Sequence, residues 1–279
     1  MNWQERLFVE RLEQKSKLIR QLLEESKNDW EAVCFEMLAK NFGLNINGSA
    51  FLSIAKSLSF NVIRKNWDNV HSLESLFLGM SGLLSPPFED PFHKTLAKKF
   101  DYLKGKHQLK AQDEILVQFS RLRPMNFPTI RWAQLAQLYV LHKALFSSFI
   151  ENQNRLNLSW LSDLEVSDYW KSHYVFGKNS AVRRKGLSKE FQDLILVNTI
   201  IPLKFTYESY LGKDPSEIVF DWIRKLKSEK NTIVRGFLKL KIPVNTALDS
   251  QSLIQLKTNY CDLKKCLNCN IGYALLDIK

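Results

Sequence analysis

The chain has 279 residues, of which 45 % are hydrophobic and 12 % aromatic, so it can build a sizeable core and is not a disordered chain. Glycine (10) and proline (8) are scarce, which argues against a turn-rich sandwich or a collagen-like protein. Forty Lys and Arg residues against 29 Asp and Glu residues give a net charge of +11, which bears on partners and solubility and not on the fold.

The sequence carries no pattern of membrane insertion or export. The apolar stretch 194–203 is interrupted by Asn198 and Pro202 and falls short of the ~18 residues that a membrane helix needs. The first six residues lack the basic and apolar regions of a signal peptide, and four cysteines in so long a chain do not form a disulfide framework. We therefore expect a cytoplasmic protein without a membrane partner.

Helical periodicity dominates the first third of the chain. Apolar residues three or four apart predict an amphipathic helix over about 3–27, followed by a second helix that Gly43 ends. Asn47 is the expected N-cap of a third helix, and a fourth is expected over about 70–84. Short loops between these helices favour antiparallel neighbours, as in a bundle.

The proline-rich segment 85–91 is the clearest break, because each proline removes a donor and restricts the residue before it. It separates an expected N-terminal helical subdomain, 1–85, from a main helical domain, 92–279, unless the two form one continuous domain. Further helices are expected over about 92–106, 112–119, 129–150, 188–211, 215–227, 231–241 and 249–260. Since no alternating strand pattern is convincing, we expect an all-α, bundle-like fold in one or two layers with a C-terminal cysteine segment.

The strongest chemical signal is the C-x4-C-x2-C spacing of Cys261, Cys266 and Cys269. Thiolates bind zinc or iron, and a two-residue gap lets two sulfurs converge on one ion. Zinc is the favoured metal, and an iron–sulfur cluster is the alternative, although that pattern requires a further cysteine. The fourth ligand is Cys34, His173 or a residue outside this chain. The competing interpretation is three reduced, partly buried thiols.

A second signal is a loop with two prolines four residues apart that leads into the expected helix at 129–150. Arg121, Arg123, Asn126, Arg131 and Gln134 lie in this loop and in the first turns of the helix. Helix N-termini with nearby arginines suit phosphates and carboxylates, so these residues predict a site for an anion or nucleic acid. Alternatively, they are solvated or satisfy buried backbone groups.

Basic residues also recur in two rows that could follow a phosphate backbone or could be solvated faces. The rows are Lys94, Lys98, Lys99, Lys104, Lys106 and Lys110, and Arg224, Lys225, Lys227, Lys230, Arg235, Lys239 and Lys241. The aromatic cluster at 169–176 could stack bases, but a corner of the core is favoured. The sequence contains no nucleotide-binding glycine loop, nucleophile elbow or His-Glu-x-x-His motif, so an enzyme is disfavoured.

Several segments together resemble a bacterial family of uncharacterised proteins, domain of unknown function 2851. They are Arg123–Ala136, Trp170 with His173 and Tyr174, Ser250–Lys257, Tyr260 with Cys261, and Cys266 with Cys269–Gly272. The resemblance brings no established activity. It implies an additional N-terminal region ahead of Trp3 that is reminiscent of restriction-like nucleases, so we expect such a domain to be absent here or to lie on a split partner chain.

The charge, the basic rows and the resemblance predict a non-catalytic helical accessory module that binds nucleic acid and serves a nuclease-like partner domain. The alternative is a structural or protein-interaction scaffold with no role in nucleic-acid binding. A complete enzyme is the least favoured interpretation, because no constellation in this chain supports one.

Overall fold

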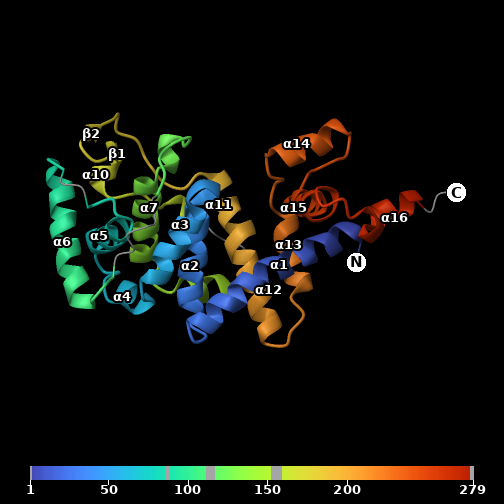
Figure 1. Ribbon diagram of the computed structural model, residues 1–279, viewed down its shortest axis with the longest axis horizontal. Coiled ribbons are helices and arrows are strands. Elements are labelled where there is room, and N and C mark those ends of the chain that lie inside the picture. Colours follow the sequence, from blue (N-terminus) through green and yellow to red (C-terminus); the bar gives the residue numbers. More distant parts are fainter. Residues whose placement is uncertain (1, 86–87, 111–116, 152–158, 277–279) are drawn as a thin grey trace. The chain divides into compact units, whose positions relative to one another are not determined.

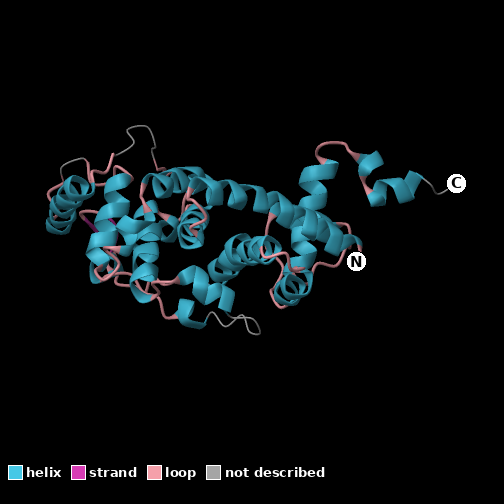
Figure 2. Cartoon of the chain, turned by 90° about the horizontal axis from the view of Figure 1, so that it is seen from below, coloured by secondary structure: helices cyan, strands magenta, loops and turns pink. Residues whose placement is uncertain are grey.

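The computed structural model describes residues 2–85, 88–110, 117–151 and 159–276. Helices account for nearly all regular structure in these ranges, and the one sheet they contain is a two-stranded hairpin (Figure 2). The expected all-α class is therefore confirmed. None of the described helices is long and apolar enough to cross a membrane.

The chain forms two compact units. The terminal unit consists of Met1–Glu25 and Ile200–Lys279, and the central unit is Ser26–Thr199. This division does not follow the expected boundary between 1–85 and 92–279. Residues 88–91 lie within the central unit, whereas Pro86 and Pro87 lie outside the described residues.

The terminal unit is built on the N-terminal helix α1. Leu12 and Ile19, seven residues apart, are fully buried on one face of α1, and between them Ser16 shares a 2.7 Å hydrogen bond with Thr206 of α12. The unit contains α1 (Trp3–Glu25), α12 (Ile201–Tyr210), α13 (Ser216–Arg224), α14 (Thr232–Lys239), α15 (Ala247–Leu256), a π-helical turn (Lys257–Cys261), a 3₁₀ turn (Cys266–Asn268) and α16 (Asn270–Leu276) (Figure 1).

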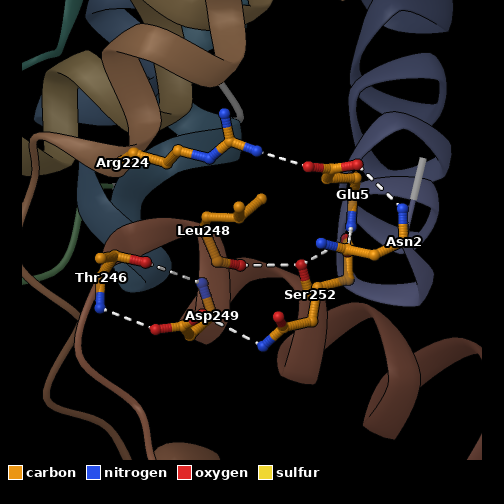
Figure 3. A network of polar contacts seen from close by, with 8 residues as sticks. Asn2, Glu5, Arg224, Thr246, Leu248, Asp249 and Ser252 are labelled. Atoms are coloured by element: carbon orange, nitrogen blue, oxygen red, sulfur yellow. Dashed lines mark hydrogen bonds and ion pairs between the residues drawn. The ribbon is translucent and has the colours of Figure 1, made fainter.

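Helix α15 begins with a capping box that also ties it to α1. The Thr246 hydroxyl accepts from the Asp249 amide, and the Asp249 carboxylate accepts from the Thr246 amide. The same carboxylate accepts from the side chain of Gln4, and the Ser252 hydroxyl donates to the Gln4 carbonyl at 2.7 Å. Arg224 forms an ion pair with Glu5 of α1 (Figure 3). The contacts of Gln4 and Glu5 join segments that lie 219 to 248 residues apart in the sequence.

The core of the central unit contains packed aromatic rings among aliphatic side chains. Phe51 and Trp132 stack with ring centroids 3.8 Å apart, and Phe77 packs against both Trp132 and Phe35. Its elements are α2 (Trp30–Phe42), α3 (Leu44–Ser57), α4 (Phe60–Arg64), α5 (Val70–Met80), α6 (Pro91–His107), a 3₁₀ turn (Pro124–Asn126), α7 (Pro128–Leu141), α8 (Leu145–Glu151), α9 (Ser159–Ser162), α10 (Asp168–Lys171), β1 (His173–Val175), β2 (Lys178–Asn179) and α11 (Lys189–Ile195), which a π-helical turn (Leu196–Ile200) continues.

Helix α6 is held against α5 by a close contact. An added Cβ at Gly79 of α5 would lie 2.3 Å from the ring of Phe100 of α6, so only glycine allows this approach. At the N-terminus of α6, the Asp90 carboxylate accepts from the amides of Phe92 and His93. The buried stripe of α6 faces α5, and its opposite face is exposed to solvent.

The structure corrects two of the expected helices near the central core. Asn47 is not an N-cap, because α3 begins at Leu44 and the Asn47 side chain is buried, where it bonds the amide and carbonyl of Gln118. The expected helix over 129–150 is two helices, because the carboxylate of Glu31 in α2 accepts from the amides of Phe146 and Ser147 and so caps a new helix there.

A third expected helix is also corrected. Of the helix expected over 112–119, only 117–119 are described, and they are not helical, whereas 112–116 lie outside the described residues. The side chain of Asn47 bonds both the amide and the carbonyl of Gln118. These two main-chain groups therefore have partners without a helix.

The contact at Gly79 predicts opposite effects for two glycine substitutions. We expect Gly79→Ala to destabilise the protein by about 1–3 kcal/mol, because the added methyl group overlaps the Phe100 ring. Gly105→Ala, in the exposed part of α6 where an added Cβ meets nothing within 4 Å, should stabilise it by about 0.5–1 kcal/mol. Urea unfolding measures both; equal midpoints for the two variants would contradict the packing described.

Candidate functional site

Three of the five predicted anion-site residues converge at the start of α7. Arg131 donates to the amide oxygen of Gln134 at 2.9 Å and to that of Asn126 at 2.6 Å. Gln134 is fully buried, and its amide group donates to the carbonyls of Lys185 and Gly186 at 3.0 Å each. The cluster therefore links α7 to the segment that precedes α11.

The contacts of Arg131 are those of a structural residue. Its guanidinium lies 3.6 Å from the ring centroid of Phe191 in α11, and only 6 % of the residue is exposed. Burial lowers the pKa of Arg131 to about 9, so the side chain is charged at neutral pH. Amide oxygens and an aromatic face surround the charge. The amide oxygens of Asn126 and Gln134 in turn accept their hydrogen bonds from this guanidinium.

The two remaining predicted residues lie outside this cluster. Arg121 and Arg123 are exposed, and Arg121 has a left-handed backbone with φ of 60°. Neither of the two side chains makes a hydrogen bond or ion pair with any residue that the structure describes. An anion site shared by all five residues is thus not assembled, and anion binding by the two exposed arginines stays a prediction.

A second buried cation lies close by in the same unit. The Lys185 ammonium donates to the carbonyls of Trp170 and His173 and lies 3.7 Å from the ring centroid of Tyr174. Burial lowers the pKa of Lys185 to about 8. Basic residues in this part of the chain are therefore partly structural, and only exposed ones are available to a partner.

The aromatic cluster forms a corner of the central unit. Trp170 is fully buried, and Tyr169 stacks between Phe92 of α6 and His173, with ring centroids 4.2 and 3.9 Å away. The Tyr169 hydroxyl donates to the carboxylate of Asp90, the residue that caps α6. These rings therefore fix the start of α6 through the hairpin and α10, and the ring of Tyr169 is covered by Phe92 and His173.

The cysteine segment follows the last long helix, as expected. Cys261 ends the π-helical turn, and Cys266 and Cys269 lie on the turn that follows, where two of the three thiols are exposed. Burial, with the nearby Cys269 and Cys266, raises the pKa of Cys261. In the described part of the chain, no group of three or more His, Cys, Asp or Glu side chains is arranged to hold a metal ion.

The proposed fourth ligands are engaged elsewhere within the central unit. Cys34 is fully buried in the core, and burial raises the pKa of its thiol well above its usual value. His173 uses Nδ1 for a 2.9 Å hydrogen bond with the Tyr169 carbonyl. A zinc ion or iron–sulfur cluster at Cys261, Cys266 and Cys269 therefore stays a prediction, which elemental analysis of the purified protein checks: metal-free protein would leave three reduced thiols.

The exposed face of α6 carries the most regular constellation of basic residues. Lys94, Lys98, Tyr102 and Lys106 follow one another at intervals of four residues, which turns the row by only about 40° per step. All four side chains are exposed, and the Lys106 ammonium lies 5.8 Å from the Tyr102 ring centroid. We call these four residues the lysine row.

The electrostatics at the C-terminal end of α6 reflect this charge. Burial and the ammonium groups of Lys106 and Lys65 lower the pKa of His107. At the other end, Lys94 pairs with Glu89 at 2.7 Å, but the Glu89 side chain is 98 % exposed and such pairs contribute little. Sequence reasoning identified the lysines of this row but missed Tyr102, although its four-residue spacing from Lys98 and Lys106 was a readable signal.

A model of the family described as "Protein of unknown function (DUF2851)" matches residues 1–232, and the chain belongs to this family. The expected resemblance is confirmed over those residues, which contain all of α6 and the Arg131 cluster. The cysteine segment lies beyond the matched part. No curated protein and no solved structure matches the chain.

The contacts of Arg131 predict that lysine cannot replace it. In Arg131→Lys a single ammonium replaces two nitrogens that bond separate amide oxygens, so one buried acceptor loses its partner. We expect a loss of about 1–3 kcal/mol in the free energy of unfolding. Arg123→Lys, at an exposed position, is the control and should change little; similar losses for both variants would disprove the structural role.

Proposed function

We propose that this protein is a helical accessory module that binds nucleic acid, and that the lysine row of α6 is its contact with the phosphate backbone. The observation that carries the proposal is the alignment of Lys94, Lys98 and Lys106 on one exposed helix face around an exposed tyrosine. In this role the chain binds the nucleic acid, and a nuclease-like partner domain catalyses the reaction.

The charge of α6 supports the proposal. The helix contains five lysines and one aspartate in 17 residues, a net charge of +4. Lys98 and Lys106 form no ion pair with any described residue, so their ammonium groups are available to phosphates. Binding to a phosphate backbone releases condensed counterions, and its strength therefore falls steeply with salt concentration.

The packing of α6 supports it as well. His93, Leu96, Phe100 and Leu103 are buried, so the helix is anchored along its length and presents the lysine row on a rigid support. A rigid row loses less side-chain and backbone freedom on binding than a flexible basic tail does.

The second basic row, in the terminal unit, is less favourable for this role. Arg224 and Lys225 pair with Glu5 and Asp221, and the other basic side chains are spread over α14 and the segments on either side of it. The exposed apolar residues next to them are Leu238 and Leu240, which offer no ring for a base. We therefore assign the primary contact to α6.

Charge reversal on α6 tests the proposal. We expect Lys98→Glu/Lys106→Glu to weaken binding to a fluorescein-labelled oligonucleotide by at least about tenfold at low salt, because two phosphate contacts become repulsive. The matched control is Lys17→Glu/Lys178→Glu, which changes the net charge equally at two exposed lysines outside α6. Fluorescence anisotropy at two salt concentrations gives both affinities.

Equal losses in the two variants would show that only net charge matters and would disprove the assignment to α6. An absence of binding by the native protein at low salt would disprove nucleic-acid binding altogether and would favour the scaffold alternative.

A further inference from the structure

The lysine row contains one residue that phosphate binding alone does not require. Tyr102 is 65 % exposed, lies four residues from both Lys98 and Lys106, and its hydroxyl forms no hydrogen bond with a described residue. A large aromatic ring that lies on the solvent face of a helix, among ammonium groups, is suited to stack on a flat ligand.

We propose that the lysine row selects single-stranded nucleic acid, and that Tyr102 stacks on an unpaired base while the flanking lysines hold the phosphates. This inference rests on the proposed function and names its substrate. In a duplex the bases are already paired and stacked, so a ring on a convex helix face gains no base contact there. A single strand can turn a base toward the ring without breaking any base pair.

The surroundings of Tyr102 leave room for such a base. Gly105 lies three residues farther along α6, next to Tyr102 on the helix surface, and an added Cβ there would meet nothing within 4 Å. A glycine inside a helix costs about 1 kcal/mol relative to alanine, so the helix forgoes that stability at this position. Gly105 therefore leaves open space on the helix surface one turn from Tyr102.

The charge beside the ring favours the same ligand. The Lys106 ammonium lies 5.8 Å from the centroid of the Tyr102 ring, and Lys98 is one turn away in the opposite direction. When a base stacks on the ring, both ammonium groups are within reach of the phosphates on either side of that nucleotide. Stacking and charge then act on the same short stretch of strand.

The test separates stacking from charge by using three ligands. The probes are fluorescein-labelled oligo(dT), a fluorescein-labelled duplex of the same length, and inorganic polyphosphate as an unlabelled competitor that carries charge but no bases. We expect the native protein to bind oligo(dT) more tightly than the duplex at equal salt. Tyr102→Leu should weaken oligo(dT) binding by about tenfold. The dissociation constant of polyphosphate, obtained from the competition, should stay unchanged.

Tyr102→Phe is the matched variant, because it keeps the ring and loses only the hydroxyl, and it should bind oligo(dT) like the native protein. Both changes are at an exposed position, and unfolding midpoints verify that the variants are folded. If Tyr102→Leu binds oligo(dT) as tightly as Tyr102→Phe, or if the native protein prefers the duplex, the inference is wrong.

Failure of this inference differs from failure of the proposed function. If the lysine reversals weaken binding and Tyr102→Leu does not, the row binds phosphate without selecting single strands. If the lysine reversals have no specific effect, the assignment of nucleic-acid binding to α6 fails, and this inference fails with it.

Discussion

The exposed lysine row depends on the contact between Gly79 and Phe100. Because glycine lacks a side chain, α5 and α6 come close enough for the Phe100 ring to lie against the α5 backbone. This contact and the Asp90 cap fix the position and the start of α6, so its basic face must point away from the core. The same helix therefore contributes to the stability of the central unit and presents its charge.

The two kinds of basic residue in the central unit have opposite roles. Arg131 and Lys185 are buried among amide and carbonyl oxygens and aromatic rings, where they connect α7, α10 and the segment before α11. Lys98 and Lys106 are exposed and form no ion pair with the described residues. Because composition counts all four alike, the net charge of +11 overstates the charge that a partner meets.

Much of the fold could be predicted from periodicity, since the stripe of Leu12 and Ile19 already defines the buried face of α1. The interruption after Leu141 could not, because the carboxylate that caps the next helix comes from Glu31, more than a hundred residues earlier. The role of Asn47 was missed for the same reason: its partner, Gln118, is 71 residues away. Local patterns cannot identify a cap or a tie supplied by a distant segment.

The candidate site shows the same limit. The sequence correctly placed Asn126, Arg131 and Gln134 together, because helix spacing and a short loop determine their neighbourhood. It could not show that Arg131 is buried against Phe191, since that ring comes from α11. The lysine row, in contrast, lies within one helix, and its spacing is fully readable once Tyr102 is included.

Ultraviolet crosslinking of oligo(dT) to the native protein, followed by peptide mapping, tests directly whether α6 contacts nucleic acid. We expect the dominant adduct to lie in the peptide that contains Tyr102, between Lys98 and Lys106 of α6. Adducts confined to the basic segment 224–241, or spread evenly over exposed lysine-rich peptides, would contradict it.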